Sequence, residues 1–179
     1  MVQVEPATQT GLLVAERAES PVDFKIVSMV FLLLVPAVSV DSATGAATLN
    51  ASSAQRIIAA CVEHATSRKQ SHAIAVVDAS GGLLAFLRMD GNPPGVGDFA
   101  LQKAVAVAKW RFSTARMAQS ARDTPGFSAA PYVVTVGGGV PIYADGIFVG
   151  SAGASGEAPS DDAECATHGV RAAGFSDSP

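Results

Sequence analysis

Residues 73–89 read AIAVVDASGGLLAFLRM in one-letter code, and this stretch decides the fold. The β-branched run at 73–77 predicts a strand, and the DASGG segment at 78–82 is rich in residues that tolerate turn conformations. Residues 83–89 predict a second strand. Two such runs around a short glycine-rich turn are typical of a β-hairpin.

An amphipathic helix is expected just before this hairpin. Asn50 or Ser52 can cap its first turn, and we expect it to end near residues 68–70. Apolar residues recur at helical spacing and form one stripe: Ile57, Ile58, Cys61, Val62 and Ala65.

After the hairpin, the glycine- and proline-rich residues 90–97 are expected to form neither strand nor helix, and Asp98 is placed to open a helix over residues 99–112. This helix is apolar on nearly every side, which predicts that it is largely buried. Lys103 lies within it. Its ammonium must either reach water along the side-chain stem or meet an anion, and both outcomes stay open at this point.

The second half of the domain supplies the remaining elements. A short helix is expected over residues 114–121, strands over 132–136, 140–143 and 147–153, and a last helix that begins at Asp161. Together with the hairpin, these strands predict an α+β fold with a five-stranded antiparallel sheet flanked by helices.

The first 48 residues form an extension whose role stays open. The apolar run over residues 26–40 is broken by Pro36 and is short for a membrane span, so a membrane is not expected as a partner. The run has the length of a secretory signal core, but four acids precede it against Arg17 and Lys25. The alternatives are a signal segment and a structural extension, and hence a secreted or a cytoplasmic protein. We expect a domain over residues 49–175 and a tail over 176–179.

Composition narrows the function classes. Half of the residues are apolar and 16% are charged, which excludes a disordered chain, and a net charge of −4 argues against nucleic acid as a partner. The low charge favours self-association. Cys61 and Cys165 lack metal-site or CxxC spacing. They are expected to be small buried residues, able to pair only if their two helices touch.

Several motifs recur in one order and spacing. They are AVVDASGGLLAFLRMDG at 75–91, Lys103 in an alanine-rich helix, GGVPI at 138–142, DG at 145–146, VG at 149–150 and GASG at 153–156. Together they resemble the haem-degrading GlcG/HbpS-like family over residues 49–175. The resemblance implies a profilin-like or Roadblock-like α/β/α sandwich, homo-oligomers from dimers to octamers, and haem or iron binding in some members. Two departures stand out: Glu157 directly follows the glycines, and residues 113–131 do not align.

The candidate site joins Lys103, as a tentative catalytic residue, to two glycine-rich corners. Backbone N–H groups at such corners, beside the start of a helix, suit a carboxylate ligand. Without the resemblance, the favoured explanation of these glycines is that they permit tight turns of the backbone. The acids at 157, 161, 162 and 164 are expected to cap the last helix, so we predict no metal site. The predicted ligand-binding residues are Gly137, Gly138, Gly139, Gly153, Ser155, Gly156 and Glu157.

Haem is an expectation from the resemblance alone. No candidate axial ligand lies in a diagnostic sequence context. Hydrolysis is not supported, because no nucleophile elbow accompanies the histidines. Three functions stay open: a small-ligand or haem-binding oligomer with haem-degrading activity as an option, an enzyme of a small-molecule pathway that uses Lys103 as acid, base or carboxylate anchor, and a structural oligomer without catalysis. The candidate axial ligands for a haem iron are His64, His72, His168, Met89, Tyr143, Cys61 and Cys165.

Overall fold

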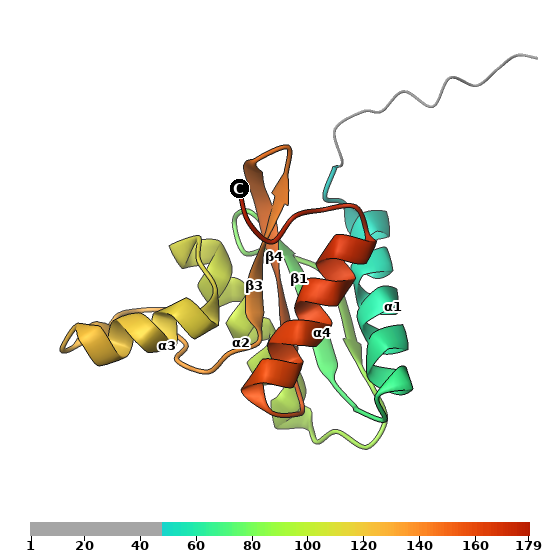
Figure 1. Cartoon of the computed structure of the whole chain (residues 1–179), viewed down its shortest axis with the longest axis horizontal. Coiled ribbons are helices and arrows are strands. Elements are labelled where there is room, and N and C mark those ends of the chain that lie inside the picture. The colour runs from blue at the N-terminus through green and yellow to red at the C-terminus, as the bar shows by residue number, and fades with distance from the viewer. Residues whose placement is uncertain (1–47) are drawn as a thin grey trace, which may run out of the picture. The chain divides into compact units, whose positions relative to one another are not determined.

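The computed structural model describes residues 48–179, and all structural statements below concern that part of the chain. It forms an α+β domain with one antiparallel sheet (Figure 1). Helix α2 packs on one face of the sheet, while α1 and α4 lie side by side on the other. The expectations for the apolar run at 26–40 lie outside the described residues. Within the described residues, no helix is both long and apolar enough to cross a membrane.

The predicted hairpin is confirmed. Strand β1 (Ala73–Asp78) pairs antiparallel with β2 (Leu83–Arg88). The turn is organised by the Asp78 carboxylate, whose Oδ1 accepts hydrogen bonds from the backbone N–H groups of Ser80 and Gly82 at 2.8 and 2.9 Å. The Ser80 hydroxyl also donates to it, and this bond, followed by the backbone donors, lowers the pKa of Asp78.

The sheet has four strands in the order β2-β1-β4-β3, so the prediction of five strands is wrong. Strand β4 (Ile147–Ser155) lies between β1 and β3 (Gly139–Ala144). The strand expected over residues 132–136 does not form. Tyr132 has a left-handed φ of 62° there, and Val133 and Val134 pack against the buried cluster of Ala106, Val107 and Met117 instead of joining the sheet edge.

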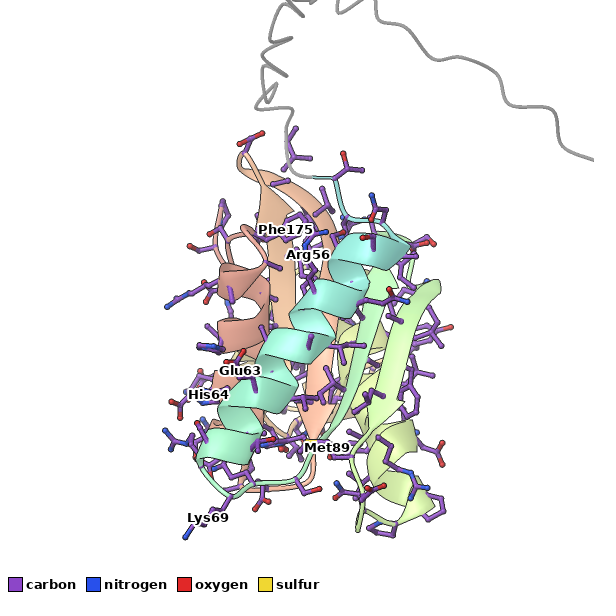
Figure 2. All side chains as sticks on the ribbon, turned by 90° about the vertical axis from the view of Figure 1, so that its right-hand side faces the viewer. Arg56, Glu63, His64, Lys69, Met89 and Phe175 are labelled. Atoms are coloured by element: carbon purple, nitrogen blue, oxygen red, sulfur yellow. A yellow bond between two sulfur atoms is a disulfide. The ribbon has the colours of Figure 1, made fainter. Side chains whose placement is uncertain are left out.

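The helices begin at recognisable caps. Helix α1 (Ala51–Ser67) follows Asn50, which forms a capping box with Ser53, so the expected start is confirmed. Helix α3 (Thr114–Asp123) is capped by Ser113 and is followed by a short 3-10 helix, Phe127–Ala129. Figure 2 looks onto the α1 side, where Lys69 projects away from the sheet beyond the end of the helix.

Two helices begin earlier than expected, each at a proline. Helix α2 (Pro94–Trp110) starts within the segment that was expected to hold no helix, and α4 (Pro159–Ala172) starts two residues before Asp161. Proline fits the first turn of a helix because its missing N–H would have no intrahelical acceptor there. The prolines that suggested a loop are therefore the helix starts.

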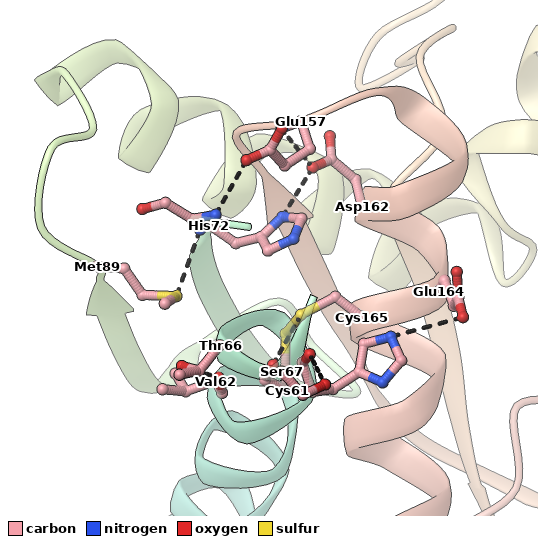
Figure 3. The surroundings of a disulfide bond; sticks show 12 residues. Cys61, Val62, Thr66, Ser67, His72, Met89, Glu157, Asp162, Glu164 and Cys165 are labelled. Atoms are coloured by element: carbon pink, nitrogen blue, oxygen red, sulfur yellow. Dashed lines mark hydrogen bonds and ion pairs between the residues drawn. A yellow bond between two sulfur atoms is a disulfide. The ribbon is translucent and has the colours of Figure 1, made fainter. Parts of the chain in front are cut away.

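The core follows the alternation of the central strand. Ile74 and Val76 point toward α1 and α4, whereas Ala75 and Val77 point toward α2. A disulfide joins Cys61 of α1 to Cys165 of α4, with a Cα–Cα distance of 4.9 Å (Figure 3). Because α1 and α4 do touch, the condition set for pairing these cysteines is met.

Candidate functional site

Lys103 is the largest fully buried side chain of the described residues, and its ammonium meets an anion inside the protein. Its Nζ donates to Oδ2 of Asp162 at 2.8 Å and to the carbonyl oxygen of Ala154 at 2.9 Å. The ring of Phe99 covers it, with 4.8 Å from Nζ to the ring centroid. The side chain does not reach water, which decides between the two outcomes left open above.

Asp162 lies in the first turns of α4, and its carboxylate contacts three other parts of the chain. Besides the lysine, its carboxylate accepts a hydrogen bond from the backbone N–H of Glu157 at 3.1 Å, and it pairs with Nδ1 of His72 at 3.0 Å (Figure 3). Asp162 is only 2% exposed. Such a carboxylate is stable in the interior because each oxygen has a partner and a cation neutralises it.

His72 is fully buried directly before β1. With Nδ1 on Asp162, its other ring nitrogen, Nε2, has no hydrogen-bond partner among the described residues. The backbone N–H of His72 donates to the sulfur of Met89 at 3.4 Å. His72, Asp162 and Lys103 therefore form a continuous buried chain of titratable groups, which we call the buried triad.

Burial lowers the pKa of Lys103 by removing water from the ammonium, while the hydrogen bond and the charge of Asp162 oppose that shift. A lysine with a lowered pKa can serve as an acid or base near neutral pH. The structure holds this ammonium with the protein's own groups. Asp162 and the Ala154 carbonyl use two of the three N–H groups of the ammonium.

The first glycine corner lies directly against the triad. Gly138 has φ of 125°, and a Cβ there would come within 2.7 Å of Lys103 Nζ and 2.9 Å of Asp162 Cβ. Gly139 donates its N–H to the Thr114 hydroxyl at 2.9 Å, and Gly137 lies against the backbone of Pro159. All three glycines are buried.

The second corner divides into a buried and an exposed half. Gly153 packs against the backbone of α2, where a Cβ would come within 2.6 Å of the Ala104 nitrogen, and Ser155 is 6% exposed. Gly156 and Glu157 are exposed, and Glu157 Oε1 accepts from the backbone N–H of Ser71 at 3.0 Å. The structure thus brings Lys103 and Gly138 together. The roles of these residues in binding or catalysis stay predictions.

The sequence did not indicate that Asp162 and His72 lie at the site of Lys103, although His72 is among the candidate axial ligands. Asp162 was interpreted as a helix-start acid, although it lies three and four residues before Cys165 and Ala166, on the buried stripe of α4. An acid on an apolar stripe requires a buried cation, and that signal was available in the sequence. His72 gave no comparable signal, since a histidine beside a strand is common.

Most of the candidate axial ligands already have a partner within the protein. Cys61 and Cys165 are joined in the disulfide, and His72 is hydrogen-bonded to Asp162. The rings of His64 and His168 stack with centroids 4.6 Å apart, and Glu164 lies 3.5 Å from His64 Nε2. Tyr143 lines a cavity of about 460 Å³. The described residues contain no cluster of three or more metal-ligating side chains.

The comparisons with known proteins agree with this architecture. The chain is 37% identical over 105 residues to Protein GlcG of Escherichia coli (strain K12), a match that covers 57% of this chain and 77% of that protein. The crystal structure of HbpS superposes with a TM-score of 0.65 at 27% identity, covering 73% of this chain and 93% of that one. The crystal structure of the PduOC:heme complex shares the fold, with a TM-score of 0.69 at 23% identity, covering 74% of this chain and all of that one. The pattern of the family described as haem-degrading protein HbpS-like matches residues 49–171, so this chain belongs to that family.

Proposed function

We propose that this domain binds haem or a related planar small molecule that carries carboxylates. The family match over residues 49–171 carries the proposal. It is supported by the likeness to HbpS and to the fold of the PduOC:heme complex. When bound, haem would supply a redox-active iron, and the protein would set its exposure and axial ligand.

The residues present fit such a ligand in its general requirements. Haem needs an apolar wall for the ring, cations for its propionates and a side chain that can reach the iron. Tyr143 lines a cavity whose wall is largely apolar and which also holds two arginines, and the His64–His168 pair lines a second cavity. Tyr143, His64 and His168 are thus the candidate ligands that line cavities outside the buried triad and the disulfide. Met89 is half-buried, and its sulfur accepts a hydrogen bond from His72.

Titration of the full chain with haemin, followed by absorption spectroscopy, tests the proposal. We expect a shifted Soret band that saturates at a fixed ratio of haem to protein. Tyr143→Phe, His64→Ala and His168→Ala, measured separately, identify the axial ligand as the variant that alters the spectrum of the complex. Absence of any saturable spectral change in the wild-type chain overturns the proposal.

Haem degradation and self-association extend this proposal. Incubating the haem complex with oxygen and a reductant should bleach the Soret band faster than in free haemin if the domain degrades haem.

We propose that the domain forms homo-oligomers, because the edge strand β2 exposes Leu83, Phe86 and Leu87 to solvent. Light scattering on the protein as it elutes from a size-exclusion column measures the mass of the assembly. A monomer at all protein concentrations contradicts the proposed self-association.

The second candidate function is an enzyme that uses Lys103 as its acid, base or carboxylate anchor. The observation that favours it is the buried triad, in which burial lowers the pKa of a lysine that also contacts Asp162. Lys103→Met should then abolish turnover of a carboxylate substrate while leaving haemin binding intact. Retained turnover in a folded Lys103→Met protein excludes this role.

A further inference from the structure

A cavity of about 460 Å³ lies where α2 ends, α3 begins and β3 passes beneath them. Part of its wall is apolar, formed by residues such as Phe112, Val140 and Pro141. Arg111, Arg116 and Tyr143 line the same cavity. A pocket with an apolar wall and a few convergent polar groups is the usual form of a small-molecule site.

Both arginines are held beside aromatic rings. The guanidinium carbon of Arg111 lies 4.2 Å from the ring centroid of Phe148, and that of Arg116 lies 5.4 Å from the ring centroid of Phe112. Nη2 of Arg111 also donates to the carbonyl oxygen of Ala79 at 3.3 Å. Stacking on an aromatic ring orients a guanidinium, and the N–H groups outside that bond can still donate. Within residues 48–179, neither arginine forms an ion pair with an acid.

The acid in the cavity wall is already neutralised. Asp177 also lines the cavity, but both of its oxygens accept hydrogen bonds from Arg171, at 2.9 and 3.1 Å. Two backbone hydrogen bonds between Ser176 and Tyr143, of 2.8 and 3.0 Å, fix this segment against β3. The cavity therefore keeps a surplus of positive charge from Arg111 and Arg116.

The other large cavity has the opposite character. It lies between α1 and β2, is mainly apolar, and its charged lining residue is Glu63. A carboxylate ligand would be repelled by Glu63 there and would find no cation in the wall. Charge thus distinguishes the two cavities, and the one near Arg111 suits an organic anion.

We propose that this cavity, which we call the arginine cavity, binds the carboxylates of a planar aromatic anion. Arg111 and Arg116 would each donate to a carboxylate, and the ring of the ligand would lie on the wall that contains Phe112 and Pro141. If the ligand is haem, whose carboxylates are the propionates, the inference rests on the proposed function. If the ligand is a free aromatic carboxylate, the inference does not depend on the proposed function.

Two probes separate these sources. Haemin tests the haem version, and phthalate, a small aromatic dicarboxylate, tests the cavity alone by chemical-shift changes in ¹H–¹⁵N spectra of the full chain. We expect phthalate to shift the amide signals of residues 111–116 and of Gly139, Val140, Ile142 and Tyr143 in a saturable manner. The Arg111→Gln/Arg116→Gln variant should bind phthalate and haemin at least about tenfold more weakly, as loss of charge-assisted hydrogen bonds predicts.

The matched control is Arg56→Gln/Arg122→Gln, which removes two exposed arginines away from the cavity and changes the net charge equally. It should bind both probes as the wild type does. Arg116→Gln alone serves if the double variant unfolds, since Arg116 is exposed. Equal affinity in the cavity variants and in the control, or phthalate shifts confined to other residues, overturns the inference. If phthalate binds as expected but haemin does not bind the wild type, the proposed function fails and the cavity assignment stands.

Discussion

The ammonium of Lys103 lies 2.8 Å from Oδ2 of Asp162, and both side chains are buried. This ion pair joins α2 and α4, which cover opposite faces of the sheet. A buried pair stabilises a fold only when both charges are matched and hydrogen-bonded, and here the Ala154 carbonyl and His72 complete the arrangement. Loss of one partner leaves the other charge in the interior without compensation.

Lys103→Met should therefore lower the free energy of unfolding by about 3–5 kcal/mol, because it strands the Asp162 carboxylate. Asp162→Asn should have a comparable effect through the stranded ammonium. The double variant Lys103→Met/Asp162→Leu should lose much less than the sum of the two single variants. Urea unfolding measures each. Lys109→Met, an exposed lysine of the same helix, is the control, and additive single effects would contradict the coupling.

The pH dependence of stability follows from the lowered pKa of Lys103. Between that lowered pKa and 10.5, the ordinary value, the unfolded chain binds more protons at this residue than the folded chain does. The contribution of Lys103 to the free energy of unfolding therefore rises with pH across this window. The difference in free energy of unfolding between wild type and Lys103→Met should grow as the pH is raised toward 10.5. A difference that stays constant over this range contradicts the prediction.

The disulfide between Cys61 and Cys165 closes a loop over a sequence separation of 104 residues. It should stabilise the domain by about 2–4 kcal/mol, chiefly by restricting the unfolded chain. Addition of a reductant that breaks the bond should lower the urea midpoint of the wild type by the corresponding amount. Cys61→Ala/Cys165→Ala should start at the lower midpoint and not respond to the reductant. Equal urea midpoints with and without the disulfide would contradict the predicted stabilisation.

Gly138→Ala tests how closely the first glycine corner meets the triad. A Cβ at this position would be 2.7 Å from Lys103 Nζ and would also contact the Ala154 carbonyl, at a left-handed φ. We expect Gly138→Ala to lower the free energy of unfolding by about 1–2 kcal/mol through the strained backbone and by about 1–3 kcal/mol more through crowding. Gly126→Ala separates the two, because it has φ of 82° and open space around it. Similar thermal unfolding of both variants would contradict the close contact.

Much of the fold could be predicted because its signals are local. The hairpin at 73–88 and the cap at Asn50 depend on neighbouring residues, so pattern and turn chemistry sufficed. The segment at 132–136 has the β-branched residues of a strand, but tertiary packing of its valines against the cluster of Ala106, Val107 and Met117 overrides that preference. This one segment is the difference between five predicted strands and four observed ones.

The site was predictable only in half. The sequence indicated Lys103, because a lysine in an apolar helix needs an anion, but that anion is 59 residues away on another helix. Which acid it meets depends on how α2 and α4 pack around the sheet, and no local pattern encodes that. The same limit applies to the arginine cavity, whose walls come from the α2–α3 connection, α3, β3, α4 and residues 177–179.

Haem binding can be tested by native mass spectrometry of the full chain, produced in cells that are supplied with haem. We expect a species in which each chain carries one haem, retained under gentle ionisation and lost on denaturation. The same spectrum gives the mass of the assembly. A chain that leaves such cells without haem, and that takes up none when haemin is added in excess, would contradict the proposed function.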